Sequence, residues 1–397
     1  MNFEEMKRRL DGLAVFRELL KDGAVAAFRE LLQDCCRNDA DNFVSHCGEF
    51  ESLLFQQSDC WTAYLRRAVM ESENVCIRNW ASGAVTAVQE ECLNRELAFL
   101  DQLSQVTLDD LTAGLDHAPD FLVGWRTEGG SIAQDYRQRM QEVGEKGYGI
   151  FARYHMFTVE NGQLVPVKHP DPQQLEQLPG YEQERQKVIA NTQALLDGKP
   201  ANNVLLYGDA GTGKSSAIKA IANNFAEQGL RLVEVKKNQL YQIPDLMDAL
   251  AANPLKFILF IDDLSFTSND DNFAALKAIL EGSVGGRAQN IAVYATSNRR
   301  HLIKETMTDR SGDDIHESDT RQELMSLSAR FGLTVTFASP DRDRYLYIVG
   351  ELAKQYGVDL DEHTLAVRSE AFAIRMGGRS ARVAKQFIEL CKSGVQV

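Results

Sequence analysis

The chain has 397 residues, with 43 Lys and Arg against 57 Asp and Glu and a formal net charge of −14. At about 100–200 residues per domain, this length predicts two or three domains, and a hydrophobic fraction of 44% with 25% charged residues excludes wholesale disorder. No apolar run approaches the roughly 20 residues that span a bilayer. The acidic balance disfavours a protein whose whole surface coats nucleic acid.

The N-terminus and the cysteines predict a cytoplasmic protein without membrane contact. The first ten residues, MNFEEMKRRL, lack the basic and then apolar order of a secretory signal. The seven cysteines are odd in number and contain no CxxC pair. A secreted disulfide framework is usually even in number, and a zinc site has closely paired ligands. We therefore expect reduced cysteines buried on helices.

Residues 1–170 predict a mostly helical N-terminal domain. Apolar residues recur at three- and four-residue steps near the N-terminus and over about 61–80 and 88–105, which is typical of amphipathic helices. At its end, residues 156–167 predict a β-hairpin that turns at Asn161-Gly162. This segment holds 17 Lys and Arg against 27 Asp and Glu, a net charge of −10. The proline-bracketed stretch Lys168–Pro172 predicts a linker after it.

Beyond the linker, short apolar strands alternate with helices up to about residue 339. Apolar strands separated by helices predict a parallel sheet covered on both faces, an αβα core over 171–339. After Pro340 only helical periodicity remains, which predicts a small helical lid over 340–397. The expected strands are 203–207, 230–235, 257–261, 291–295 and 333–337, and the expected helices are 214–228, 246–251, 272–281, 341–356, 362–376 and 380–392.

A glycine-rich loop follows the first core strand and opens the first core helix. It fits the pattern GxxxxGK[ST], in which backbone N–H groups and the helix N-terminus bind phosphate oxygens. In that pattern the lysine reaches the β- and γ-phosphates and the hydroxyl binds Mg²⁺. We therefore expect ATP or GTP, together with Mg²⁺, at a loop that comprises Gly208, Asp209, Ala210, Gly211, Thr212, Gly213, Lys214, Ser215 and Ser216.

Two acids at the end of a buried strand supply the second half of such a site. Phe257–Ile261 ends in Asp262-Asp263, 48 residues beyond Lys214. The first carboxylate is expected to hold Mg²⁺ through water, and Asp263 is placed to orient or deprotonate the attacking water. The pairing with Lys214 predicts nucleoside triphosphate hydrolysis.

Three further features carry polar residues, one at the end of a strand, one just before a strand and one at the start of a helix. Asn298 ends the fourth core strand, where its amide can touch the γ-phosphate or the water. Arg330 directly precedes the fifth strand, and Gly377-Gly-Arg379-Ser-Ala-Arg382 opens the last lid helix. An arginine at that helix start can face the bound nucleotide.

Taken together, these motifs resemble those of an AAA+ ATPase. Three longer sequence segments are similar to those of an uncharacterised bacterial AAA+ ATP-binding family that is catalogued as a domain of unknown function. These segments are Pro200–Gly208, Asp262–Phe266 and Tyr294–Leu302. The resemblance implies an αβα ATPase core with a helical lid. It puts Lys214, Ser215 and Asp262 on the phosphate and Mg²⁺ positions.

The resemblance also implies roles for residues further from the phosphates. Arg330 matches the arginine finger that reaches a neighbouring subunit, which implies a homo-oligomer. Arg382 matches the lid arginine better than Arg379 does. The short segment Leu178-Pro-Gly180-Tyr181 is similar to one that packs near adenine.

Two departures from the family pattern qualify these expectations. Asp263 stands where most members carry glutamate, so its carboxylate is one methylene shorter and we expect slow turnover. The stretch Lys236–Lys256 lacks the aromatic-apolar-glycine loop of threading unfoldases, and Tyr241 is expected to pack at a helix start instead. A protein-unfolding motor is therefore disfavoured.

The leading hypothesis is an oligomeric ATPase that remodels or loads a partner macromolecule, docking a client protein through its N-terminal domain. The alternative is a nucleotide-dependent switch or scaffold with little or no hydrolysis, which Asp263 favours. A small-molecule kinase has little use for Arg330 and the lid. Nucleic acid stays open as a less favoured partner, because basic residues follow strands at Lys236-Lys237 and over 299–304.

Overall fold

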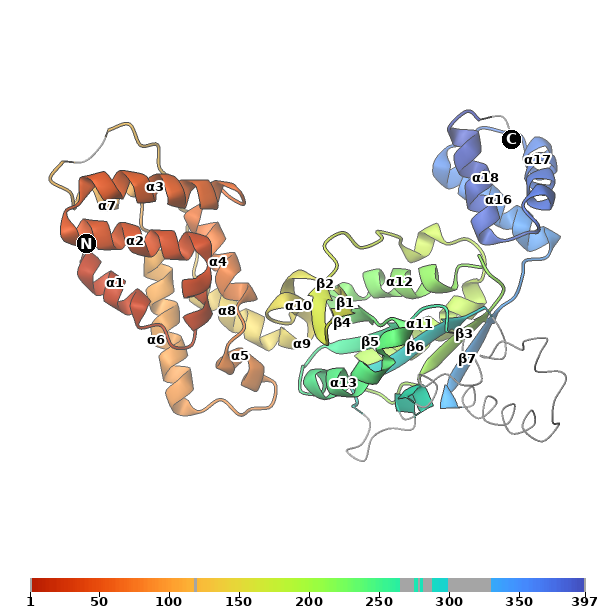
Figure 1. Cartoon of the computed structure of the whole chain (residues 1–397), viewed down its shortest axis with the longest axis horizontal. Coiled ribbons are helices and arrows are strands. Elements are labelled where there is room, and N and C mark those ends of the chain that lie inside the picture. The colour runs from red at the N-terminus through yellow and green to blue at the C-terminus, as the bar shows by residue number, and fades with distance from the viewer. Residues whose placement is uncertain are drawn as a thin grey trace. The chain divides into compact units, whose positions relative to one another are not determined.

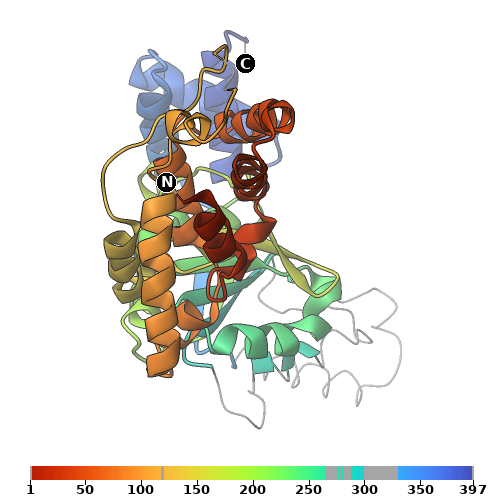
Figure 2. The same cartoon turned by 90° about the vertical axis from the view of Figure 1, so that its left-hand side faces the viewer.

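The computed structural model describes residues 2–117, 120–264, 275–277, 279–280, 288–298 and 330–395. The chain forms two compact units, Met1–Arg153 and Tyr154–Val397. The first is helical and the second contains the sheet, as Figure 1 and Figure 2 show. The basic cluster expected over 299–304 and half of the helix expected over 272–281 lie outside the described residues.

The first unit consists of helices around an aromatic core. Phe28 stacks on Trp61 with ring centroids 4.8 Å apart, and Phe50 packs edge-on against Trp125 at 4.6 Å. All four side chains are buried, so each contributes a large apolar area to the core. The helices are α1 (Phe3–Asp11), α2 (Gly23–Arg37), α3 (Ala40–Phe55), α4 (Trp61–Glu71), α5 (Val75–Trp80), α6 (Ala87–Leu103), α7 (Leu108–Thr112), α8 (Ile132–Gln141), α9 (Val143–Lys146) and α10 (Ile150–Arg153), with a 3₁₀ turn η1 (Arg17–Lys21).

The single helical stretch expected over 61–80 was wrong, because the chain breaks between α4 and α5. Ser72, which ends α4, adopts an extended conformation. Asn74 then caps α5, its side chain accepting a hydrogen bond from the backbone N–H of Ile77. An asparagine cap competes with continued helix by satisfying the N–H groups of a new helix start.

A buried carboxylate holds the turn that follows α1. Glu96 on α6 accepts hydrogen bonds from the backbone N–H groups of Ala14, Val15 and Phe16, at 2.7, 3.1 and 2.9 Å. Its side chain is 8% exposed. Because a buried charge is tolerated only where it is hydrogen-bonded, this contact ties α6 to the chain between α1 and η1.

The second unit is built on a seven-stranded sheet in the order β2-β1-β4-β5-β6-β3-β7. All neighbouring strands are parallel except the β1–β2 pair. This topology, with helices on both faces and a helical lid, confirms the predicted αβα P-loop fold class. The strands are β1 (Met156–Glu160), β2 (Gln163–Pro166), β3 (Val204–Gly208), β4 (Leu230–Glu234), β5 (Lys256–Ile261), β6 (Ile291–Ser297) and β7 (Leu333–Phe337).

The hairpin placed at the end of the N-terminal domain belongs instead to this sheet. β1 pairs in parallel with β4, Met156 lying opposite Leu232 and Thr158 opposite Glu234. The unit boundary accordingly falls after Arg153 rather than near residue 170. The hairpin sequence predicts that two strands pair with each other. It does not predict that β1 also pairs with β4, because that contact depends on how distant segments of the chain fold together.

Helices cover both faces of the sheet and form the lid. α12 (Lys214–Asn224) and α13 (Ile243–Ala251) lie on opposite faces in Figure 1. α11 (Glu182–Leu196) precedes β3, and the lid consists of α16 (Arg342–Tyr356), α17 (Glu362–Arg375) and α18 (Ala381–Lys392). Short 3₁₀ turns lie at η2 (Leu175–Gln177), η3 (Ala226–Gln228) and η4 (Lys237–Gln242). Tyr241 in η4 is 66% exposed, so the expectation that it packs was wrong.

None of the described helices combines the length and apolar character that a membrane span requires.

We predict that Glu96→Gln destabilises the first unit. Replacing one carboxylate oxygen by an amide turns a donor toward one of the three N–H groups that Glu96 now accepts from, and the free energy of unfolding should fall by about 1.5–3 kcal/mol. All three tryptophans, Trp61, Trp80 and Trp125, lie in this unit, so denaturant unfolding followed by tryptophan fluorescence reports on it. Glu91→Gln on the same helix is the control, because Glu91 pairs with Arg95 at the surface. Equal midpoints for the two variants would contradict the prediction.

Candidate functional site

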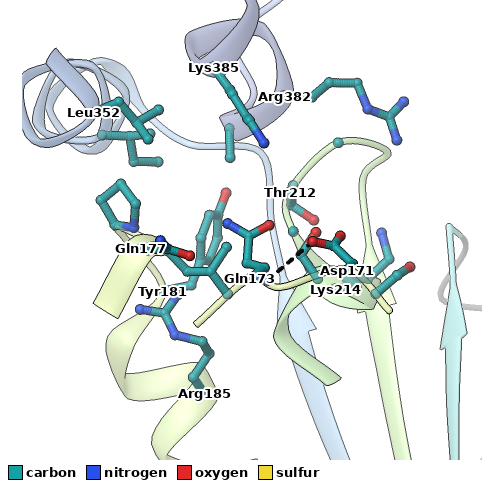
Figure 3. A pocket seen from close by; sticks show the side chains of 18 of the residues that line it. Asp171, Gln173, Gln177, Tyr181, Arg185, Thr212, Lys214, Leu352, Arg382 and Lys385 are labelled. Carbon is teal, nitrogen blue, oxygen red and sulfur yellow. Dashed lines mark hydrogen bonds between the residues drawn. The ribbon is translucent and has the colours of Figure 1, made fainter. Parts of the chain in front are cut away.

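A cavity of about 980 Å³ lies at the carboxyl ends of the sheet strands. The loop after β3, the start of α12, the ends of β5 and β6, the linker before α11 and the lid all contribute to its walls. Figure 3 shows Gln177, Tyr181 and Arg185 at one end and Thr212 and Lys214 at the other, with Lys385 extending from the lid between them. Cavities of a few hundred to about 1,000 Å³ are typical of small-molecule sites.

The loop between β3 and α12 adopts a backbone that requires glycine. Gly208, Gly211 and Gly213 have φ angles of 141°, 78° and 93°, which L-residues with a Cβ rarely adopt. A Cβ on Gly208 would also lie 2.0 Å from the carbonyl oxygen of Phe337. Of the predicted phosphate-loop residues, those from Ala210 to Ser216 line the cavity. Gly208 and Asp209 do not, and Asp209 instead accepts hydrogen bonds from the backbone N–H and hydroxyl of Ser339 at 2.9 and 2.6 Å.

Lys214 is buried at the bottom of this loop. Its Nζ donates to the carbonyl oxygens of Gly208 and Asp209, at 2.9 and 2.7 Å, and to Oδ1 of Asn298 at 2.9 Å. The side chain is 5% exposed. Burial lowers the pKa of Lys214, and the nearby carboxylates, first of all Asp209, act in the opposite direction. The ammonium therefore lies at the floor of the cavity with its donors directed by the loop and by β6.

The two strand-end carboxylates meet the loop and β6 at one point. Ser215 Oγ donates to Asp262 Oδ1 at 2.6 Å, which joins α12 to the end of β5. Asn298 Nδ2 donates to Asp263 Oδ1 at 2.8 Å, which joins β6 to the same turn. Asp263 has a φ of 50°. The structure thus brings together the five residues that the sequence singled out for phosphate, metal and water: Lys214, Ser215, Asp262, Asp263 and Asn298.

The segment expected near adenine forms the opposite end of the cavity. Tyr181 lines the cavity, stacks on Phe337 with centroids 5.3 Å apart, and donates its hydroxyl to the carbonyl oxygen of Ala338 at 2.6 Å. Burial raises the pKa of Tyr181 to about 12. Gly180 does not line the cavity; its carbonyl oxygen accepts a hydrogen bond from the buried Arg185. A Cβ on Gly180 would lie 2.9 Å from Ile348 of the lid, so this glycine allows the lid to pack closely.

The two candidate lid arginines have different surroundings. Arg382 lines the cavity, and its backbone N–H donates to the carbonyl oxygen of Gly211 at 2.9 Å. Arg379 forms a bidentate ion pair with Glu370, at 2.8 and 2.6 Å. The pair holds the pKa of Glu370 below its ordinary value. The geometry therefore favours Arg382 as the arginine that can face a ligand.

Arg330 lies apart from this cavity. It precedes β7, which runs parallel to β3 with Leu333 opposite Val204 and Phe337 opposite Gly208. The phosphate loop follows Gly208, so it leaves the sheet at the end opposite to Arg330. The strand rises about 13 Å between those ends, and Arg330 is not among the residues that line the cavity.

The residues that could hold a metal are oxygen donors. Ser215 Oγ and Asp262 Oδ1 lie 2.6 Å apart at the end of the cavity that Lys214 lines. Within the described part of the chain, no group of three His, Cys, Asp or Glu could hold a metal ion. Mg²⁺ is commonly bound by one or two protein oxygens together with substrate phosphates and water, so the residues present fit this ion.

Comparison with protein families finds a match over the second unit. Residues 151–395 match a family described as "Protein of unknown function (DUF815)". This range is more than half of the chain. The chain belongs to this family. Membership brings no stated activity, but it agrees with the resemblance drawn from the phosphate-loop and strand-end phrases.

Comparison with solved structures finds AAA+ proteins at low identity. A RuvB variant from Thermotoga maritima is 16% identical with a TM-score of 0.37, and the alignment covers 56% of this chain and 66% of RuvB, slightly under two thirds. The FIGL-1 AAA domain in complex with ADP is 18% identical with a TM-score of 0.38, covering 55% of this chain and 72% of that domain. Comparison with curated protein sequences finds no match.

Several residues of the site were missed by the sequence analysis. Thr296 lies two residues before Asn298 and contacts both strand-end acids. Lys385 lines the cavity one helical turn beyond Arg382, a spacing that could have revealed it. The linker residues Asp171 and Gln173 also line the cavity, because Asn223 of α12 donates to both of their carbonyl oxygens at 2.8 Å. No local sequence pattern predicts the contact between Asn223 and the linker.

We predict that Arg382→Ala weakens binding of ATP whereas Arg379→Ala does not. A hydrogen bond to a charged group is worth about 1.5–3 kcal/mol, so removing the arginine that lines the cavity should raise the Kd at least about tenfold. Arg379 is the matched control, because it opens the same helix but pairs with Glu370. Titration calorimetry with ATP measures both. An Arg379→Ala loss as large as that of Arg382→Ala would contradict the assignment.

Proposed function

We propose that this chain is a Mg²⁺-dependent AAA+ ATPase that acts as a homo-oligomer to remodel or load a partner macromolecule. One observation carries the proposal: the hydrogen bonds that link Lys214 to Asn298, Asn298 to Asp263 and Ser215 to Asp262 converge at one end of a single cavity. A lysine, a hydroxyl, two carboxylates and an amide at a phosphate loop are the groups that triphosphate hydrolysis requires.

Binding is proposed to use both ends of the cavity. The loop over 210–213 and the N-terminus of α12 present backbone N–H groups to the phosphates, and Lys214 moves its donors from the loop carbonyls to the β- and γ-phosphate oxygens. Tyr181 and its neighbours enclose the base end. Arg382 closes the phosphate end from the lid. The hydrogen bond from the Arg382 N–H to Gly211 supports this placement, because it already holds the lid helix against the loop.

The chemical step is assigned to the strand-end acids. Ser215 and Asp262 would hold Mg²⁺, which when bound neutralises charge on the phosphates. As a general base, Asp263 accepts one proton of the attacking water on a carboxylate oxygen. The water oxygen bonds to the γ-phosphorus while the bond from that phosphorus to the β,γ-bridging oxygen breaks, and ADP and phosphate are the products. Asn298 orients that carboxylate through its Nδ2 hydrogen bond of 2.8 Å.

Hydrolysis is proposed to depend on a second copy of the chain. Arg330 lies at the end of β7 away from the phosphate loop of its own chain. Such an arginine can act on a γ-phosphate only when a neighbouring subunit supplies it. We therefore assign Arg330 as the arginine finger of the oligomer.

The N-terminal segment is proposed to dock the client protein. The chain as a whole is then divided in function into a docking domain, an ATPase core and a lid. The described unit Met1–Arg153 carries 16 Lys and Arg against 26 Asp and Glu, a net charge of −10, and the remaining residues carry −4. An acidic surface favours a partner with basic groups. We further propose a cytoplasmic protein with protein clients, and nucleic acid as a less favoured partner.

A nucleotide-dependent switch with little hydrolysis is the second candidate. Asp263 favours it, since the shorter carboxylate stands at the usual glutamate position. Close packing of the lid on the loop also favours it, because a Cβ on Gly211 would lie 3.0 Å from Ser380 Oγ and 3.1 Å from Arg382 Cβ. A ligand that binds both parts would shift the lid between states.

Phosphate release with MgATP separates the two candidates. We expect measurable release from the wild type, none from Lys214→Ala, and from Asp263→Asn a rate at least about 10²-fold lower, as is typical of losing a general base. Asp263→Asn should still bind ATP, because it leaves the loop intact. Equal release from the wild type and Lys214→Ala would favour the switch.

The oligomer is tested by mixing two inactive variants. Arg330→Ala should bind ATP but lose at least about 10³-fold in rate, the usual worth of an arginine finger. Lys214→Ala keeps Arg330 but lacks the phosphate lysine. Mixing the two should restore activity, because one chain supplies the finger and the other the site. No recovery on mixing, with a wild-type rate per subunit that stays flat on dilution, would rule out a finger supplied between subunits.

A further inference from the structure

Thr296 stands between the two strand-end acids and contacts both. Its Oγ1 donates to Asp262 Oδ1 at 2.5 Å and accepts from the backbone N–H of Asp263 at 2.9 Å. Its carbonyl oxygen accepts from the backbone N–H of Leu264 at 2.7 Å. A threonine hydroxyl has one proton and two lone pairs. When the hydroxyl donates its hydrogen bond to Asp262, a lone pair remains to accept the hydrogen bond from the N–H of Asp263.

These contacts act on a turn with an unusual backbone. Asp263 has a φ of 50°, one of four positive values found for non-glycine residues in the described chain. A non-glycine residue in this region costs free energy and persists only where its surroundings impose it. Three successive residues of the turn contact Thr296, whose side chain is 2% exposed. In the described structure, the N–H of Asp263 has one other contact, a longer one of 3.1 Å to Asp262 Oδ1.

The left-handed turn directs the second acid toward its partner. Asp263 Oδ1 accepts from Asn298 Nδ2 at 2.8 Å, and Asn298 lies two residues beyond Thr296 on the same segment. Thr296 and Asn298 therefore hold Asp263 from its backbone and from its carboxylate. Because aspartate is one methylene shorter than glutamate, the position of its carboxylate depends more closely on the position of the backbone.

We propose that Thr296 is the positioning residue of this site: its hydroxyl fixes Asp262 and the left-handed turn at Asp263 together, so that the metal-binding carboxylate and the base keep one geometry. The proposal rests on the proposed ATPase function. Thr296 touches neither the nucleotide nor the water in this role, and acts through the two acids.

The test compares Thr296→Val, which keeps the shape but removes the hydroxyl, with Thr296→Ser, which keeps the hydroxyl. We expect Thr296→Val to lower kcat by about 10²-fold, since misplacing a reacting group by about 1 Å can cost that much. KM for ATP should change by less than about threefold, because the lost interaction does not contact the substrate. Thr296→Ser should recover kcat to within about threefold of wild type.

A matched control separates positioning from stability. Thr192 on α11 is also fully buried, and its hydroxyl pairs with that of Tyr294 at 2.9 Å, away from the acids. Thr192→Val should lower the thermal midpoint like Thr296→Val but leave kcat unchanged. A Thr296→Val enzyme with wild-type kcat, or a Thr192→Val enzyme with the same kcat loss, would overturn the proposal.

Failure of the proposed function is recognised separately. If the wild type binds MgATP without hydrolysing it, the hydrolysis in the proposed function fails and kcat cannot report on Thr296. If the wild type binds no nucleotide, the proposed function fails. A crystal structure of Thr296→Val then decides: loss of the positive φ at Asp263 supports positioning, and its retention overturns it.

Discussion

One carboxylate oxygen joins the three parts on which the site depends. Asp262 Oδ1, at the end of β5, accepts from Ser215 on the phosphate-loop helix, from Thr296 on β6 and from the backbone N–H of Asp263. The sheet makes this convergence geometrically available, because β5, β6 and β3 are neighbours and parallel, so their carboxyl ends reach the same edge. A strand order that separated them would leave the same residues too far apart to meet.

The lid extends this arrangement from the core to the last helix. The chain between β7 and α16 is held from two sides: Tyr181 donates to Ala338, and Asp209 accepts from Ser339. The hydrogen bonds from Ser339 hold the pKa of Asp209 below its ordinary value. Segments from both ends of the cavity thus contact the connection that carries the lid.

Much of the second unit could be predicted from local patterns. Each apolar run from Val204 to Phe337 in the described core became a strand within one or two residues of its expected bounds, because strands buried on both faces read as continuous apolar runs. The three lid helices likewise lie within about one residue of expectation. In the first unit, the periodicity over 61–80 failed, because α4 ends at Ser72 and Asn74 caps a new helix.

The sequence by itself determined the chemistry of the site: a glycine-rich loop with Lys214 and Ser215, two acids after an apolar strand, and Asn298 after another. Their identity and spacing depend on backbone requirements that are local, such as the positive φ angles of the loop glycines. Only the tertiary structure decided that the Thr296 hydroxyl joins them and that Arg382, which the family resemblance favoured, lines the same cavity. The contacts of Thr296, Arg382 and the hairpin beside β4 depend on which elements lie next to one another in the fold. Elements become neighbours because apolar faces that are distant in the sequence are buried together, and a short stretch of sequence does not predict that.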